Sequence, residues 1–276
     1  MLELVNVRKY FSTPQGQFAA LDDVSFKVAE GEFVSVVGPS GCGKSTVLNI
    51  VAGLTAPDEG HVLVKGRVVR DVSRIMGYTF QQSTLLPWRT VRDNVGLGLE
   101  LRGIAEAARR ATVDRLIEQV GLTQFADAHP HQLSGGMAKR VEIARVLAID
   151  PEVLLMDEPF GALDAQTRAA MHNHLLHLLQ HLKKTVLFIT HDLEEALILS
   201  DRVITMRARP GRIRGEHVIP LERPRDARRA RTARRPGQPR SGGGSPRSSR
   251  CCRTAGRSRT RCHRRRPRPC SPGRCR

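Results

Sequence analysis

A glycine-rich loop at residues 38–45 carries the first side chains whose type and spacing predict a chemistry. It runs Gly38, Pro39, Ser40, Gly41, Cys42, Gly43, Lys44 and Ser45, with Thr46 behind it, the spacing of a phosphate-binding loop. Glycines let backbone N–H groups wrap a phosphate chain, and the helix expected after the loop adds its positive N-terminal end. We expect Lys44 to reach the β- and γ-phosphates of a nucleotide and Ser45 to hold Mg²⁺, whereas Cys42 contributes only its backbone.

Two adjacent acids, Asp157 and Glu158, follow the apolar run 153–156. Successive strand residues point to opposite sides, so the two carboxylates need not serve one purpose. Asp157 is expected to hold Mg²⁺ through water, and Glu158 to face an attacking water as its general base. An acid pair at a helix N-terminus is the alternative, and the phosphate-binding loop upstream favours the catalytic interpretation.

A second turn of small residues, Ser134, Gly135 and Gly136, precedes another expected helix. A hydroxyl, bare backbone N–H groups and a helix dipole together predict a second anion site. Because the phosphates of one nucleotide need only one cradle, the second cradle is expected to serve the nucleotide of another subunit.

Strand-like and helical patterns alternate over residues 1–221, which we expect to form one domain. Strands are expected at 2–7, 24–37, 61–80, 153–156, 185–190, 201–206 and 213–221. Helices are expected at 45–52, at 165–182 and from Asp192, where Glu195 three residues on predicts a capping box. The expected fold class is α/β: a P-loop NTPase core with a parallel sheet, an N-terminal antiparallel β part and a helical subdomain inserted at about 82–149.

The net charge of +18 lies entirely in the last 56 residues. Residues 221–276 hold 20 Arg, no Lys and two acidic residues, whereas residues 1–220 hold 25 basic and 25 acidic ones. The segment 222–276 has no Ile, Val, Phe, Met, Tyr or Trp, so we expect an arginine-rich disordered tail. We interpret it as an out-of-frame translation of a GC-rich gene; the alternative is a real arm that binds nucleic acid or acidic lipid.

Cysteine and hydropathy patterns indicate the cellular compartment in which the protein is expected to work. Five of the six cysteines lie in the tail, which excludes a disulfide framework for residues 1–221, and their irregular spacing disfavours a zinc site. No apolar run approaches the roughly 20 residues that span a bilayer, and no signal-peptide core is evident at the start. We expect a protein of cytosolic type that reaches a membrane only through a partner.

The motifs together resemble those of the ATP-binding subunits of ABC transporters, over residues 2–221. They come in that family's order: the loop 38–45, Gln81 in Gly-Tyr-Thr-Phe-Gln, Leu-Ser-Gly-Gly-Met at 133–137, Asp-Glu-Pro at 157–159, Ala-Leu-Asp at 162–164 and Thr-His-Asp at 190–192. The resemblance implies a head-to-tail homodimer that closes on two ATP and two Mg²⁺. It also implies two membrane permease subunits as partners and a peripheral place on the cytoplasmic face of the cell membrane.

The resemblance assigns further roles. It implies that Gln81 senses Mg²⁺ and the attacking water, in a loop that meets the membrane subunits. Asp164 would couple the two sites across the dimer, and His191 would contact the γ-phosphate and help set the water. Phe11 best matches the aromatic that stacks on adenine, with a half-buried strand aromatic as the alternative. Ser134 and Gly136 of the opposing subunit would, with Lys44, neutralise the transferred phosphoryl group.

Three runs, at 82–95, 158–164 and 208–213, look like the nitrate, sulfonate and taurine importers of bacteria. This implies import of a small anionic solute that a periplasmic or lipid-anchored binding protein delivers. Two departures from the family pattern stand out. Lys139 replaces the usual Gln, which we expect to alter contacts near the opposing nucleotide, and the arginine-rich tail replaces the usual C-terminal helix.

Two other functions are weighed. One is a non-transport ATPase of the same superfamily that acts on DNA or the ribosome through the tail, and the other is an inactive frameshifted product. The neutral charge of residues 1–220 and the lack of a coiled-coil insertion disfavour the first, so no specific nucleic acid is expected. Four histidines lie on the helix expected at 165–182, and we favour a solvated face over a metal site at His177 and His181. The four are His172, His174, His177 and His181.

Overall fold

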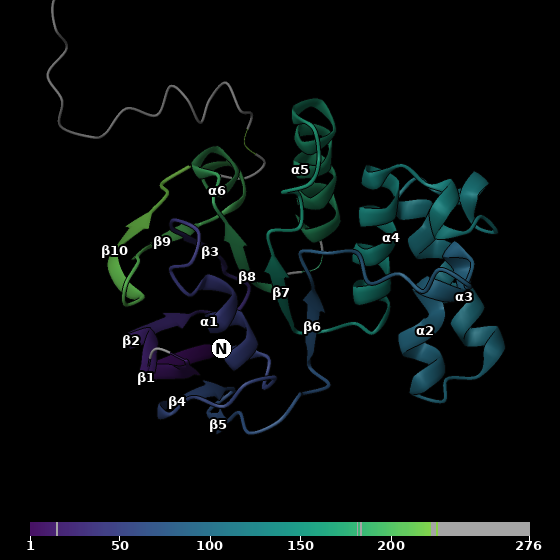
Figure 1. Ribbon diagram of the computed structural model, residues 1–276. Coiled ribbons are helices and arrows are strands. Elements are labelled where there is room, and N and C mark those ends of the chain that lie inside the picture. The colour runs from purple at the N-terminus through teal and green to yellow at the C-terminus, as the bar shows by residue number, and fades with distance from the viewer. Residues whose placement is uncertain (15, 181, 183, 222–224, 226–276) are drawn as a thin grey trace, which may run out of the picture. The chain divides into compact units, whose positions relative to one another are not determined.

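The strands of the protein form two sheets in the computed structural model, which describes residues 1–14, 16–180, 182, 184–221 and 225 (Figure 1). An antiparallel sheet has the order β2-β1-β4-β5, from Leu2–Thr13 (β1), Gly16–Val28 (β2), Glu59–Val64 (β4) and Arg67–Val68 (β5). The other sheet has the order β10-β9-β3-β8-β7-β6. Its strands are Phe33–Val37 (β3), Met76–Thr79 (β6), Val153–Asp157 (β7), Thr185–Thr190 (β8), Arg202–Arg207 (β9) and Arg212–Val218 (β10). Apart from the β9–β10 pair it is parallel, so the expected fold class is confirmed.

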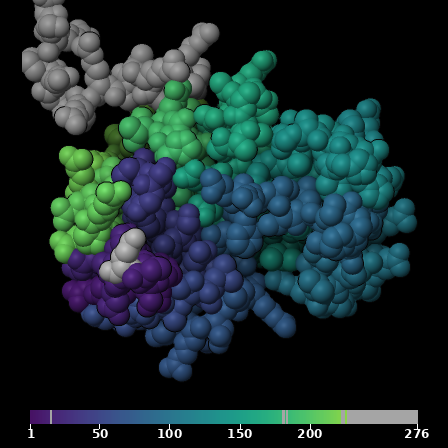
Figure 2. Space-filling model, viewed as in Figure 1, coloured from purple at the N-terminus to yellow at the C-terminus, as the bar shows by residue number. Residues whose placement is uncertain are grey.

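Helices follow most strands of the parallel sheet. They are Lys44–Val51 (α1), Val91–Leu101 (α2), Glu106–Gln119 (α3), Gly135–Ala148 (α4), Ala165–Gln180 (α5) and Leu193–Leu199 (α6). Between β6 and β7 the chain forms α2, α3 and α4, which lie together beyond the edge strand β6 (Figure 1) and, on the face seen in Figure 2, on the side away from the antiparallel sheet. Of the described helices, none combines the length and apolar character needed to cross a membrane.

One expected strand, 24–37, is wrong as a single element. The structure divides it into β2 and β3, which belong to different sheets. The division falls at Gly31, whose φ of +71° is a left-handed conformation that glycine adopts without strain. The expected strand 61–80 divides in the same way into β4, β5 and β6. Alternation within each run predicts the strands, but not the turn between them.

Neighbouring residues of the central strands face two different cores. In β7, Leu154 and Met156 pack with the helices α2 to α5, whereas Val153 and Leu155 pack with α1 and the antiparallel sheet. All five residues of β7 and all six of β8 are buried, as expected for strands covered on both faces. Burial on both faces fixes the register of the strands, because a shift by one residue would move the side chains of each core into the other.

The expected capping box of α6 does not form. The side chain of Asp192 accepts from the backbone N–H groups of Glu194 and Glu195, so the cap itself is present. The carboxylate of Glu195 instead lies 2.8 Å from Nε2 of His172 on α5, and both side chains are buried. The expectation of a solvated histidine face is therefore wrong for His172, because a buried acid on the next helix holds its ring.

Arg225 is the one described residue beyond the expected domain end at 221, and it is buried. Its guanidinium donates to the carbonyl oxygens of Leu197, at 2.9 Å, and of Ser200, both at the end of α6. It also donates to the carbonyls of Ile219 and Leu221. A cation at a helix C-terminus satisfies carbonyls that have no partner within the helix. The boundary at 221 and the disordered tail stay predictions, since residues 226–276 lie outside those described.

Replacing Arg225 with Ala is expected to lower the free energy of unfolding by about 1–3 kcal/mol, because buried carbonyls lose their charged donor. Urea unfolding of the full chain measures the change. Arg214→Ala, at an exposed position on β10, is the matched control and should leave stability unchanged. Equal stability of Arg225→Ala and the parent protein would show that this contact contributes nothing.

Candidate functional site

The phosphate-binding loop connects β3 to α1, and its glycines meet steric demands. Gly41 and Gly43 have φ values of +76° and +90°. A Cβ on Gly43 would lie 2.5 Å from Cδ2 of Leu21, and one on Gly38 would lie 2.7 Å from Sγ of the buried Cys42. Only glycine fits these two positions, so the loop exposes backbone N–H groups where α1 begins. The side chain of Cys42 packs in the core, and burial raises the pKa of its thiol.

Lys44 is held inside the loop. Its Nζ donates to the carbonyl oxygens of Gly38, at 2.9 Å, and Pro39, at 3.3 Å, and lies 3.6 Å from Oε1 of Glu158. The side chain is almost completely buried. A buried ammonium group with flexible donors at a helix N-terminus is arranged to bind a chain of phosphates.

Ser45 and Asp157 meet as the sequence predicts for a metal site. Ser45 Oγ donates to Oδ1 of Asp157 at 3.1 Å, and Gln81 lines the cleft beside them. Hydroxyl, carboxylate and amide oxygens are the hard ligands that Mg²⁺ prefers, so this donor set fits the ion. Burial, reinforced by the neighbouring Glu158, raises the pKa of Asp157. A cation beside Asp157 would offset that desolvation.

Glu158 is placed between an ammonium group and an imidazole. Its Oε2 lies 2.8 Å from Nδ1 of His191, and since a carboxylate can only accept, Nδ1 carries the hydrogen. Glu158 has a φ of +42°, a conformation that costs a non-glycine residue on the order of 1–3 kcal/mol. Such strain persists only where the surroundings impose it, and here the contacts with Lys44 and His191 hold the carboxylate in place. The expected division of roles between the two acids stays a prediction.

These side chains converge because three parallel strands end at one edge. In the register of β3, β8 and β7, Val37 pairs with Thr190, and Ile189 pairs with Asp157. The loop 38–45, Glu158 and His191 each follow directly after one of these strands. Ligands of open α/β sheets bind outside the carboxyl ends of the strands, which is where this site lies.

A cleft of about 470 Å³ opens over the loop. Nine of the expected site residues line it: Phe11, Ser40, Gly41, Gly43, Lys44, Ser45, Thr46, Gln81 and Glu158. Phe11 is 43% exposed. Lys9 lies over that ring, 5.7 Å from its centre.

The turn of Ser134, Gly135 and Gly136, here called the signature turn, lies elsewhere. Ser134 is the N-cap of α4 and accepts from the backbone N–H of Met137 at 3.3 Å. None of Ser134, Gly135 and Gly136 lines the cleft over the loop of their own chain. Asp164 also lies outside it, and hydrogen bonds from Thr167 and from the backbone of Gln166 lower its pKa. His177 is described but His181 is not, and the described residues contain no cluster that could hold a metal through three His, Cys, Asp or Glu side chains.

Three residues that the sequence did not single out contribute to the site. Phe18 pairs with Phe11 in the β1–β2 register and lines the cleft with Ala20. Tyr78 hydrogen-bonds Asn49 at 3.0 Å, and burial together with Asp157 raises its pKa. An antiparallel pairing of 2–13 with 16–28 would have indicated Phe18, but the expected first strand stopped at residue 7.

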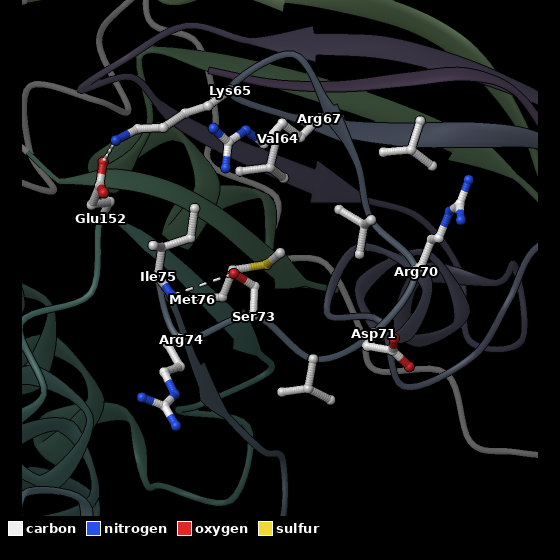
Figure 3. Close-up of a pocket in the computed structure, with 13 residues that line it drawn as sticks. Val64, Lys65, Arg67, Arg70, Asp71, Ser73, Arg74, Ile75, Met76 and Glu152 are labelled. Carbon is white, nitrogen blue, oxygen red and sulfur yellow. Dashed lines mark hydrogen bonds and ion pairs between the residues drawn. The ribbon is translucent and has the colours of Figure 1, made fainter. Parts of the chain in front are cut away.

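A second cavity, of about 780 Å³, is larger but lacks this chemistry (Figure 3). It lies between β5 and β6, and Lys65 in its wall forms an ion pair with Glu152. The guanidinium groups of Arg67, Arg70 and Arg74 point in different directions (Figure 3). Without a glycine-rich turn or converging donors, this cavity is a poor phosphate site, so the cleft over residues 38–46 is the candidate active site.

Asp157→Asn is expected to raise the free energy of unfolding of the nucleotide-free protein at neutral pH. The pKa of Asp157 in the folded protein is raised above its ordinary value of 3.8. The folded protein therefore favours the protonated side chain. The stabilisation from that form is fully present below pH 3.8 and is lost as the pH rises through the folded-state pKa. Asn keeps an acceptor for Ser45 but removes the buried charge. Urea unfolding should show a larger gain at pH 7 than at about pH 4. An equal gain at both would contradict the assignment to ionisation.

Comparison with known proteins agrees with the geometry. The model of a family described as ABC transporter matches residues 21–161. An uncharacterised ABC transporter ATP-binding protein of Methanocaldococcus jannaschii is 53% identical over 225 residues, which cover 82% of this chain and 84% of that protein. A taurine import ATP-binding protein of Ruegeria pomeroyi is 47% identical, covering 79% and 82% of the two chains. A nitrate import ATP-binding protein of Synechococcus elongatus is 45% identical, covering 80% and 81%.

A solved structure supports the same placement. It is the dimeric, post-hydrolysis state of an ATP-binding cassette bound to ADP and Pi, which superposes with a TM-score of 0.72 at 35% identity. The match covers 80% of this chain and all of the other. The chain therefore belongs to the ABC transporter family, as an ATP-binding subunit that hydrolyses ATP.

Proposed function

We propose that this subunit hydrolyses Mg²⁺-bound ATP in a homodimer and drives the import of a small anionic solute through two permease subunits. The observation that carries the catalytic part is the convergence of Lys44, Glu158 and His191 at the ends of three adjacent strands. Ion pairing and hydrogen bonding at 3.6 Å and 2.8 Å hold the carboxylate of Glu158 between the other two.

In the proposed reaction, a water oxygen attacks the γ-phosphorus of ATP. Glu158 accepts the proton of that water, the bond to the β–γ bridging oxygen breaks, and ADP and phosphate leave. His191 fixes the orientation of the Glu158 carboxylate and contacts the γ-phosphate. Lys44 and the loop N–H groups stabilise the charge that develops on the phosphoryl oxygens. Mg²⁺, held by Ser45, Asp157 and Gln81, would supply further charge neutralisation.

The place of the signature turn supports the proposed dimer. Ser134 caps α4, leaving the first N–H groups of that helix directed at whatever lies before it. The turn does not contribute to the cleft of its own chain. A second copy, turned head to tail, would bring this anion site to the γ-phosphate, with Asp164 coupling the two sites. The dimeric state of the similar solved cassette supports this arrangement.

The transport role rests on the named relatives. Proteins that are 45–47% identical are named for taurine and nitrate import, and both solutes are small and carry an anionic group. The described part of the chain has no helix that could span a membrane. We assign the solute path to the permeases. We place the subunit on the cytoplasmic face of the membrane, with the solute delivered to the permeases by a periplasmic or lipid-anchored binding protein.

Glu158→Gln is expected to lower the hydrolysis rate by about 10²–10⁴-fold, because the general base is lost while the phosphate cradle stays intact. ATP affinity, measured with a fluorescent analogue, should remain within a few-fold. Size-exclusion chromatography with ATP and Mg²⁺ should then show a trapped dimer.

The control for this substitution is Glu118→Gln on the exposed face of α3, which should hydrolyse ATP at the normal rate. Normal hydrolysis by Glu158→Gln would remove Glu158 as the base. Loss of ATP binding in that variant would show that the carboxylate supports the cradle instead.

Deletion of the gene in its host is expected to prevent growth on one of three sole sources: nitrate, taurine or another alkanesulfonate. Growth on ammonium and sulfate should be normal, because those nutrients enter by other routes. The intact gene should restore growth, and the gene carrying Glu158→Gln should not. Normal growth of the deletion strain on all three sources would refute the proposed solute class but not the ATPase.

A further inference from the structure

One face of the signature helix α4 carries three charged side chains directed at a single loop. Lys139, Glu142 and Arg145 are spaced three residues apart, which places them on neighbouring turns of the helix. Each contacts the segment from Phe80 to Thr84, which begins just after β6 and contains Gln81.

Lys139 closes one end of this contact. Its Nζ donates to the carbonyl oxygen of Phe80 at 3.2 Å and to Oε2 of Glu142 at 2.5 Å. The Lys139 side chain is 9% exposed and that of Glu142 is 2% exposed. The ammonium group is thus directed into its own chain, which differs from the expected effect of Lys139 near the opposing nucleotide.

Glu142 and Arg145 hold the other end. Oε1 of Glu142 accepts from the backbone N–H of Thr84 at 2.9 Å, and the guanidinium of Arg145 donates to the carbonyl and the hydroxyl of Thr84. Both polar groups of the Thr84 backbone are therefore bound by α4. The contacts at Phe80, just before Gln81, and at Thr84, three positions after it, hold the loop on both sides of Gln81.

A buried ion pair is a poor source of stability, because desolvation of both charges offsets most of their attraction. Such a pair is more effective at selecting one arrangement, since leaving either partner unsatisfied in the interior is strongly unfavourable. The contacts here run to main-chain atoms of the loop, so what they select is the position of the loop backbone. The side chain of Gln81 lines the nucleotide cleft and moves with that backbone.

We propose that Lys139 and Glu142 are positioning residues that set the place of Gln81 in the cleft from the signature helix. The proposal rests on the proposed role of Gln81 toward Mg²⁺ and the attacking water. It links the two anion sites of one chain: Ser134 is the N-cap of α4, and the contacts with the loop of the other site begin at Lys139 on the same helix. A shift of α4 when Ser134 meets the partner's nucleotide would carry Gln81 with it.

The test variant is the double substitution Lys139→Met with Glu142→Leu, which removes both charges and keeps the side-chain volume, so that the fold survives. We expect kcat to fall roughly tenfold with KM for ATP nearly unchanged, since the loop loses its position but the cradle does not. The variant Lys139→Gln with Glu142→Gln should recover most of the rate, because it restores a donor for Phe80 and an acceptor for Thr84. Lys184→Met, which breaks a remote pair with Asp150, is the control.

The decisive measurement repeats the test variant in a Gln81→Ala background. If the pair acts through Gln81, the further loss of kcat should disappear there, which a general structural defect would not do. An undiminished loss in that background overturns the inference and leaves the role of Gln81 intact. A normal kcat for Gln81→Ala alone overturns that role, and the inference with it. Equal rates for the Met/Leu variant and the parent protein also overturn the inference.

Discussion

The parallel pairing of β3, β8 and β7 is the constraint on which the site depends. Each strand is buried on both faces, so its register cannot slip without exchanging residues between two cores. The phosphate loop, the acid pair and His191 come from segments more than 30 residues apart, and the fixed register places them together. Packing far from the cleft thereby determines distances within it.

Several buried polar side chains have partners within the domain. Lys44 has two carbonyls and Glu158, Lys139 has a carbonyl and Glu142, and His172 has Glu195. The last pair joins α5, which begins just after Asp164, to α6, which begins just after His191. Burial raises the pKa of Asp157, which disfavours its ionised form and is the condition expected of a group that binds a cation. The buried polar groups thus connect the segments that carry the catalytic motifs.

The motifs in the sequence are local: a loop, an acid pair after a strand, and a histidine after a strand. The structure brings these three segments to one edge of the parallel sheet. What alternation and periodicity could not predict depends on contacts between distant segments. Gly31 divides one apparent strand between two sheets, Glu195 bonds His172 instead of its own helix cap, and Phe18 reaches the cleft only by pairing with Phe11. The division between residues 1–221 and the tail, and the roles of the site residues, stay predictions.

Arg225 has a consequence for where the chain can be shortened. Its guanidinium is matched by four main-chain carbonyls from the end of α6 and from the segment 219–221. A protein that ends at residue 221 would leave those carbonyls without their charged donor. The arginine-rich tail is therefore better removed after residue 225 than at the expected boundary.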